Sequence, residues 1–201
     1  SVSDIEKDLK KFSKERKMEL ILPSLYSELE GDALPKIVSE ISKTNYLSHI
    51  IIGLDRANKS QAQKAWKFFK KIKTPFTILW NDGPKLKRLN DELKKKDLAP
   101  SQHGKGRNVW YCLGMCIARD EARSVALHDC DIKTYDRRML AKLFYPVVNP
   151  LFNFEFCKGY YPRVAQNKMG GRVARLLVFP LITALEKTIG NSDYLNFMKS
   201  F

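Results

Sequence analysis

The sequence predicts an α/β fold, a single domain with a mostly parallel sheet flanked by helices, on three observations. Short apolar runs alternate with longer amphipathic segments along most of the 201 residues. The run 49–54 is almost purely apolar after its histidine, which is typical of a strand buried on both faces of a parallel sheet. No Gly- or Ser-rich linker divides the chain. Strands that alternate with helices of this length form βαβ units, so a Rossmann-like sheet is expected.

The expected elements follow from the apolar spacing, taken from the first residue onward. A basic amphipathic helix at 1–17 comes first, and residues 18–201 then form the main domain. Pro23 is expected to end the first strand, because proline has no amide hydrogen, and Pro180 to kink or break the last helix. The strands are predicted at 18–22, 49–54, 76–80, 124–128 and 153–158, and the helices at 32–42, 60–72, 84–96, 109–118 and 172–187.

Composition bounds the class of protein but not its partner. The hydrophobic fraction of 44% and the aromatic fraction of 11% are enough for a real core, which excludes a disordered chain. Four cysteines are too few for a disulfide scaffold, and the longest apolar stretch, 176–185, is too short to span a bilayer. We therefore expect a cytoplasmic protein without a membrane span. The net charge of +14 has four possible explanations: binding of nucleic acid, of an anionic membrane or of a phosphorylated small molecule, or simply a solvated Lys-rich surface.

Asp129 and Asp131 are the sharpest candidates for chemistry. They directly follow a predicted strand, 124–128, and ligands of parallel sheets bind beyond the carboxyl ends of the strands. Two carboxylates at this spacing can bind one hard divalent cation, which then takes further ligands from a diphosphate. The alternative is a pair of solvated turn carboxylates that cap the segment near Tyr135. His128 is expected to border or orient the aspartates rather than to act as a base.

Two basic, glycine-containing segments are candidates for anion binding. Segment 104–108 places Lys105 and an arginine close to a predicted helix N-terminus, where backbone and charge can hold a phosphate. The alternative for it is a flexible loop. Segments 158–163 and 170–172 contain Lys158, Arg163 and Arg172, which can clamp a phosphate or carboxylate. The tyrosines of the same stretch are more simply explained by packing than by stacking on a sugar or base. Cys112 and Cys116 are more simply explained as core residues than as zinc ligands.

In chain order these segments form a recognisable pattern. Pro23-Ser24-Leu25 ends the first strand, Asp55 follows the second, and Gly104-Lys105-Gly106 and Asp129-Cys130-Asp131 come next. The most diagnostic piece is the run GGRVARLLVFPLI, which begins at Gly170. The pattern resembles the GT-A glycosyltransferases of the family 2-like group, and most closely the glucosyl-3-phosphoglycerate synthases. The likeness extends over 18–185.

The resemblance implies a metal-dependent, retaining transfer of glucose from UDP- or GDP-glucose to 3-phosphoglycerate, by a protein that tends to form homodimers. It implies a catalytic domain that continues beyond the last residue of this chain. By the same analogy Asp129, Asp131 and Arg172 are the catalytic residues. The resemblance also implies how the donor is bound: Pro23, Ser24 and Leu25 frame the base with Asp55 nearby, and Lys105 contacts the nucleotide. Asp129 contacts the ribose or the sugar, and Asp131 binds Mg²⁺ or Mn²⁺. Arg172, together with the backbone of Gly170 and Gly171, binds the acceptor.

The sequence departs from that family's pattern at two places, and other functions stay open. Tyr26-Ser27-Glu28 stand where the family has Asn-Glu-Glu, and Ala174-Arg175 stand where it has Thr-Glu. A GT-A transferase with another sugar donor or acceptor is therefore the first alternative. A nucleic-acid-binding module is the second, disfavoured because no nucleic-acid-binding signature occurs and the lysines spread over several helices. A catalytically inactive scaffold is the third.

Overall fold

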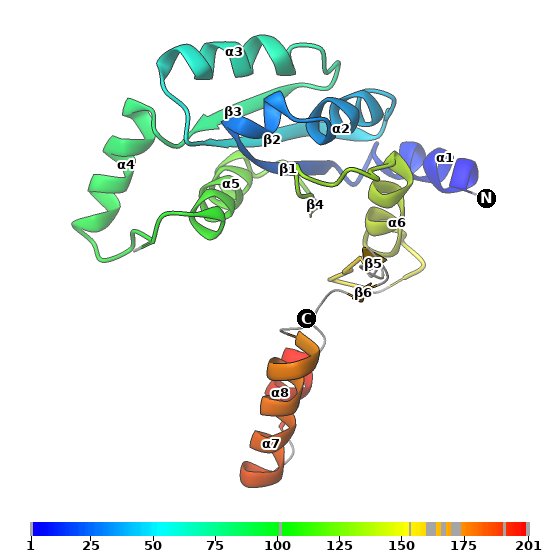
Figure 1. Ribbon diagram of the computed structural model, residues 1–201. Helices are drawn as coiled ribbons and strands as arrows, with labels where there is room; N and C mark the ends of the chain where they lie inside the picture. Colours follow the sequence, from blue (N-terminus) through cyan, green and yellow to red (C-terminus); the bar gives the residue numbers. More distant parts are fainter. Residues whose placement is uncertain are drawn as a thin grey trace. The chain divides into compact units, whose positions relative to one another are not determined.

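The computed structural model describes residues 2–100, 102–152, 154–159, 164–165, 168–169, 174–190 and 192–199 (Figure 1). A boundary between Lys158 and Gly159 divides the chain into two compact units, and each is described by itself.

The first unit is built on a four-stranded parallel sheet, which confirms the predicted fold class. Its strands are β1 (Met18–Leu25), β2 (Leu47–Asp55), β3 (Phe76–Trp80) and β4 (Ser124–Leu127). They lie in the order β3-β2-β1-β4. β2 and β3 are added on one side of β1, and β4 pairs with β1 on its other side. The strand order therefore reverses between β1 and β4, and ligands of open α/β sheets bind at such a point.

Helices cover both faces of this sheet. The 3₁₀ turn η1 (Tyr26–Glu30) follows β1, and Figure 1 shows α2 and α3 on one face and α5 on the other. The larger core joins residues of α1, α2, α3 and α6 to Leu20, Leu22, Ile50 and Ile52, which alternate along the strands with Ile21 and Ile51 of the smaller core under α5. The helices are α1 (Val2–Phe12), α2 (Ala33–Ile41), α3 (Lys59–Phe69), α4 (Pro84–Lys94), α5 (Lys105–Arg119) and α6 (Arg137–Val148).

The prediction that Pro23 ends the first strand is wrong, because β1 continues through it to Leu25. The carbonyl of Ile21 accepts a hydrogen bond from the amide of His128, so Ile21 directs its backbone polar groups toward β4. Pro23, two residues further, faces the same side, and the β1–β4 ladder has already ended at Ile21. No ladder bond needs the missing amide hydrogen there, which is why the strand accepts a proline.

Two further expectations need correction. The strand predicted at 153–158 is absent from its described residues, 154–158, where Phe154 and Phe156 are exposed. An apolar run forms a strand only where another strand can pair with it, and local sequence does not show this. The helix predicted from Val109 begins four residues earlier, at Lys105 after Gly104, so the basic segment forms the first turn of α5 rather than a loop before it.

The second unit contains a short antiparallel pair, β5 (Val164–Ala165) with β6 (Lys168–Met169), followed by helices. A π-helical turn (Ala174–Val178) leads into α7 (Phe179–Ile189), and α8 (Asp193–Lys199) follows. Pro180 lies in the first turn of α7, directly after the π-helical turn, so the helix changes type beside the proline, where the sequence predicted a kink or a break. The candidate residues Arg163, 170–171 and Arg172 lie outside the described residues. Among the described helices, none is both long enough and apolar enough to cross a membrane.

Candidate functional site

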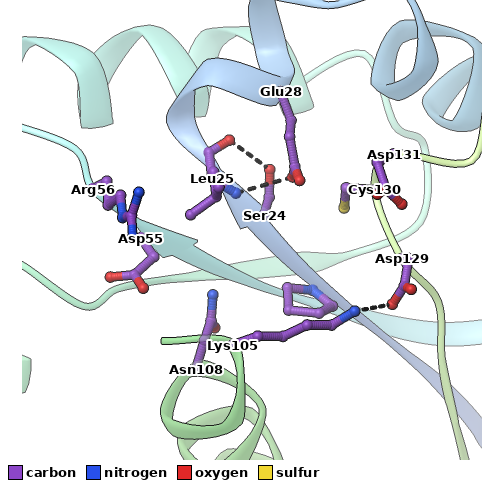
Figure 2. Close-up of a pocket in the computed structure, with 11 residues that line it drawn as sticks. Ser24, Leu25, Glu28, Asp55, Arg56, Lys105, Asn108, Asp129, Cys130 and Asp131 are labelled. Atoms are coloured by element: carbon purple, nitrogen blue, oxygen red, sulfur yellow. Dashed lines mark hydrogen bonds and ion pairs between the residues drawn. The ribbon is translucent and has the colours of Figure 1, made fainter. Parts of the chain in front are cut away.

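A cavity of about 210 Å³ opens at the carboxyl ends of β1 and β2, beside the residues that follow β4 (Figure 2). It lies at the point where the strand order reverses. The seven residues predicted to hold the donor and its metal all line this cavity, namely Pro23, Ser24, Leu25, Asp55, Lys105, Asp129 and Asp131. Its lining consists of Pro23, Ser24, Leu25, Glu28, Asp55, Arg56, Lys105, Asn108, Asp129, Cys130 and Asp131.

Lys105 and Asp129 form an ion pair across the cavity, one from the first turn of α5 and the other from the segment after β4. Their side chains are 58% and 38% exposed, so water screens the pair and its net contribution to stability is small. An anion that enters the cavity can therefore replace Asp129 as the partner of Lys105. This geometry suits a phosphate contact for the lysine and leaves the aspartate for a hydroxyl or a cation.

Asp131 is exposed and makes no hydrogen bond or ion pair with any described residue. Asp129 is two residues away, and a third carboxylate, that of Glu28, lines the same cavity. These hard oxygen donors suit Mg²⁺ or Mn²⁺. Within the described part of the chain no three His, Cys, Asp or Glu side chains form a closed metal site. The residues thus fit a cation that shares its coordination with phosphates, as Mg²⁺ usually does.

Glu28 belongs to the site although the sequence did not single it out. It lies in η1, and its Oε2 accepts a hydrogen bond of 3.0 Å from the amide of Leu25. Burial raises the pKa of the Glu28 carboxyl, and the charge of Asp131 raises it further. Its position three residues after the strand end, where a carboxylate can bond back to the chain, is the sequence signal that could have identified it.

The position of Lys105 depends on how closely α5 approaches the sheet. Asn108, which is 3% exposed, donates a hydrogen bond of 2.8 Å from Nδ2 to the carbonyl of Gly53 in β2. A Cβ atom at Gly53 would lie 1.7 Å from Asn108 Oδ1 and 2.7 Å from Cys112 Sγ. Only glycine leaves room for this contact, so Gly53 allows α5 to dock and so places its first turn beside the cavity.

Asp55 is paired with Arg107 rather than free. Arg107 Nη2 lies 3.5 Å from Asp55 Oδ1, and the two side chains are 9% and 7% exposed. Arg107 also bonds through Nη1 to His103 Nε2 at 3.4 Å. Arg107 was expected to supply charge to a phosphate together with Lys105, but it does not line this cavity. Asp55 lines it, as predicted, and the arginine lies behind the carboxylate.

Cys130, between the two aspartates, and His128, directly before them, are unsuited to acid–base or nucleophilic catalysis. Burial raises the pKa of the Cys130 thiol, so the residue stays a neutral thiol. Burial lowers the pKa of His128 to about 4, so its ring is neutral at pH 7. His128 packs edge-on against Tyr135, with ring centroids 5.3 Å apart. These contacts support the expectation that His128 borders the aspartates.

Comparison with known proteins supports the resemblance noted in the sequence. No protein-family model matches the chain. A curated glucosyl-3-phosphoglycerate synthase from Persephonella marina is 45% identical over 201 residues, which are 100% of this chain and 50% of that protein. Another with the same name, from Methanococcoides burtonii, is 39% identical over 189 residues, 92% of this chain and 46% of that protein. The chain thus spans about half the length of the curated relatives it matches.

Solved structures show the same fold. Glucosyl-3-phosphoglycerate synthase from Mycobacterium tuberculosis in complex with phosphoglyceric acid superposes with a TM-score of 0.56 and 18% identity, covering 92% of this chain and 56% of that one. A complex of that enzyme with Mn²⁺, uridine diphosphate and phosphoglyceric acid gives a TM-score of 0.55 and 17% identity, covering 92% and 55%. The predicted resemblance to glucosyl-3-phosphoglycerate synthases is therefore confirmed in sequence, and the predicted fold in structure.

Proposed function

We propose that this chain carries the nucleotide-sugar-binding part, and the acceptor motif, of a metal-dependent retaining glycosyltransferase that moves glucose from UDP- or GDP-glucose to 3-phosphoglycerate. The observation that carries the proposal is one cavity, at the reversal point of the sheet, lined by seven residues expected to bind the donor and its metal. The similarity to two synthases of that name supports the donor and acceptor classes.

The residues of the cavity divide the work of holding the donor. Pro23, Ser24 and Leu25 frame the nucleoside at the end of β1. Lys105 turns from Asp129 to the diphosphate, and Asp129 then faces the ribose or the sugar. A Mg²⁺ or Mn²⁺ ion at Asp131 would neutralise the negative charge that grows on the diphosphate as it leaves. Lys105 acts on the same charge, and such interactions accelerate transfer because they are strongest in the transition state.

Acceptor binding is assigned through the family resemblance alone. Gly170, Gly171 and Arg172 match the family's motif and would hold the phosphate or carboxylate of 3-phosphoglycerate, which a guanidinium can bind with two parallel hydrogen bonds. Arg175 stands where the family has an acidic residue and adds positive charge to this motif.

We place the reaction in the cytoplasm, where free thiols such as the buried Cys112, Cys116 and Cys130 persist.

Thermal unfolding with UDP-glucose and with GDP-glucose, each with and without Mg²⁺, tests the proposal. A ligand at about 100 times its Kd stabilises the native state by about 2.7 kcal/mol, which raises the Tm of a protein of this size by roughly 5–10 °C. We expect such a rise with at least one donor, larger with Mg²⁺. Asp131→Asn should remove the Mg²⁺-dependent part of this rise. The control Asp120→Asn lies at the C-terminal end of α5, whereas Lys105 at its first turn lines the cavity, and this variant should keep the Mg²⁺-dependent part.

A Tm that neither donor moves, with or without Mg²⁺, contradicts the proposal. If a donor binds, product formation from 3-phosphoglycerate and a panel of nucleotide sugars separates the proposed reaction from transfer of another sugar or to another acceptor. Binding of a donor with no effect of Mg²⁺ would instead support the inactive scaffold.

A further inference from the structure

Half of the formal net charge of +14 comes from one short segment, 56–81, which contains α3. Its 26 residues include seven Lys and Arg side chains and not one Asp or Glu. The lysines of the chain do occur on several helices, as the sequence showed, but the excess of positive charge is concentrated in this segment. None of the roles proposed above uses α3.

Lysines on other helices are accompanied by carboxylates, whereas those of α3 are not. In α4, Lys94 lies 3.8 Å from Asp91, and in α1, Lys7 lies 3.9 Å from Asp4. Opposite charges at such spacings largely cancel each other's field. The six lysines of α3 and of the turn after it form no ion pair with any described residue. They are Lys59, Lys64, Lys67, Lys70, Lys71 and Lys73, and all six are exposed.

The outer surface of α3 presents these lysines in rows. Ala65 and Phe69 are fully buried and belong to the larger core, so one side of the helix packs on the sheet (Figure 1). Lys64, Lys67 and Lys71 follow one another at spacings of three and four residues. Residues at these spacings are neighbours on a helix surface, so the three lysines form one row along the solvent-exposed side.

An exposed tryptophan lies in a second row of the same surface. Lys59, Trp66 and Lys70 follow one another at spacings of seven and four residues, which places them along one line of the helix. The side chain of Trp66 is 50% exposed, so half of this large ring is available to a partner. Lys70 Nζ lies 5.2 Å from the centroid of the ring, a cation–π contact that keeps positive charge beside it.

Unpaired lysines around an exposed aromatic ring select a polyanion that carries flat rings of its own. Proteins that bind single-stranded nucleic acid combine positive charge along the backbone with aromatic side chains on which bases stack. The 11 residues of α3 extend over roughly 16 Å, enough for several successive phosphates. An anionic membrane fits less well, because the apolar residues Ala65 and Phe69 face the core and leave the helix no apolar side to insert.

We propose that the outer surface of α3 binds single-stranded nucleic acid, with phosphates on the lysines and a base stacked on Trp66. The inference goes beyond the proposed function and does not depend on it, because no residue of α3 lines the donor cavity. Lysine–phosphate contacts and stacking on a ring carry little sequence information, so the surface should bind strands of different sequence with similar affinity.

Fluorescence anisotropy of a labelled oligouridylate, titrated with the full chain at several salt concentrations, tests this inference. For single strands the logarithm of the affinity falls with the logarithm of the salt concentration by about 0.7 per phosphate that a cation neutralises. The triple variant Lys64→Gln/Lys67→Gln/Lys71→Gln should therefore bind about tenfold or more weakly at low salt, and its salt slope should be smaller by about 2.

Trp66→Gln tests the stacked base separately. Stacking of one base on an aromatic ring changes affinity about fivefold or more, so this variant should bind the oligouridylate at least that much more weakly. Inorganic polyphosphate, used as an unlabelled competitor, has charge but no base. The variant and the wild type should bind the polyphosphate with affinities within about twofold of each other, because the lysines are unchanged.

The matched control is Lys7→Gln/Lys10→Gln/Lys11→Gln, which removes the same net charge from three exposed lysines of α1. It should keep most of the wild-type affinity, and thermal unfolding checks that each variant is folded. Equal weakening by the α1 and α3 triple variants would show that only net charge acts, and would overturn the inference.

Three further results would also overturn it. The first is a wild-type Kd for the oligouridylate above about 100 μM at low salt, weaker than ordinary non-specific binding. The second is a Trp66→Gln variant that binds the oligouridylate as tightly as the wild type. The third is tighter binding to vesicles that contain phosphatidylserine than to the oligouridylate, which would make α3 a membrane-binding surface. All three leave the proposed function standing.

Discussion

The two ends of the parallel sheet carry similar buried polar groups but pair them differently. At the amino ends, Glu19 is fully buried, and its Oε1 accepts from Arg119 Nε at 3.1 Å. His49, 7% exposed, bonds to Thr77 Oγ1 at 2.9 Å. At the carboxyl ends the corresponding carboxylate–arginine pair is longer, 3.5 Å, and the corresponding histidine, His128, has no hydrogen bond to a described residue at either ring nitrogen.

This difference separates a structural end from a ligand-binding end. At the amino ends the ionisable Glu19 and His49 have partners, so their pairing serves stability, although Glu19 Oε2, Ser124 Oγ and the Tyr46 hydroxyl are buried there without hydrogen bonds to described residues. The carboxyl ends differ because the cavity of the candidate site opens there. At the carboxyl ends Asn81 and His128 are buried without hydrogen bonds to described residues. Asp131, which is exposed, also has no hydrogen bond or ion pair with a described residue. Each buried unpaired group lowers stability by about 1–3 kcal/mol. The account therefore predicts that substitutions at the amino ends change mainly stability, and that those at the carboxyl ends change mainly ligand affinity.

Arg119→Met should have the largest effect on stability. It leaves the fully buried Glu19 carboxylate without its arginine, and breaking a buried ion pair in this way costs about 3–5 kcal/mol. Urea unfolding measures the loss. The matched variant at the other end, Arg107→Met, should cost less than half as much, because Asp55 lines a cavity that water can enter. Equal losses in the two variants would remove the contrast between the ends.

Acid sensitivity should concentrate at His128. Its pKa is about 4 in the folded chain and about 6.5 in the unfolded one, so the unfolded state binds more protons between these values. Its contribution is complete above pH 6.5 and is lost as the pH falls toward 4, up to about 3 kcal/mol in total. His128→Phe keeps an aromatic ring against Tyr135 and should lose less stability between pH 7 and pH 4.5 in urea unfolding.

Burial also lowers the pKa of His49, which acts in the same direction, so part of the acid sensitivity should survive in the His128→Phe variant. A variant that loses as much stability as wild type over this pH range would show that His128 is not the group responsible.

Gly53→Ala should reduce both stability and ligand affinity, because Gly53 lies where α5 docks on the sheet. The new methyl group would overlap the side chain of Asn108 and force α5 outward. Overpacking of this kind costs about 1–3 kcal/mol, and the displaced first turn carries Lys105. Calorimetric unfolding and titration with the donor that stabilises the wild type measure the two effects. A stable variant with weakened affinity, or the reverse, would show that docking of α5 and donor binding are independent.

Lys105→Met should have the smallest effect on stability and a clear effect on binding. Its ion pair with Asp129 is exposed, so the free energy of unfolding should change by about 1 kcal/mol or less. The affinity for magnesium pyrophosphate should fall about tenfold, since charge-assisted hydrogen bonds contribute about 1.5–3 kcal/mol. Lys133→Met, a lysine on the exposed segment after Asp131, is the control and should change neither quantity by a comparable amount. An unchanged pyrophosphate affinity in the Lys105 variant would contradict its assignment to the diphosphate.

The sequence predicted the elements and the first cavity well because both depend on local patterns. Apolar runs defined the strands, and the rule that ligands bind at strand ends brought together Pro23, Asp55 and Asp129 before any distance was known. Strand continuation through Pro23 was missed because it depends on where pairing with β4 ends. The state of Asn81 was missed because an asparagine in a turn looks the same whether its amide is paired or free, and only the folded chain shows that its amide is buried without a hydrogen bond to a described residue.

Hydrogen–deuterium exchange of the full chain, with UDP-glucose and separately with GDP-glucose, each with Mg²⁺, tests the contrast between the two ends most directly. The account predicts that the donor that binds protects the backbone amides of 24–28, 104–108 and 129–131. Exchange at 17–19, 47–49 and 119–124 should stay as in the free chain. Protection confined to the amino ends, or equal at both ends, would contradict the assignment of the carboxyl ends as the donor site.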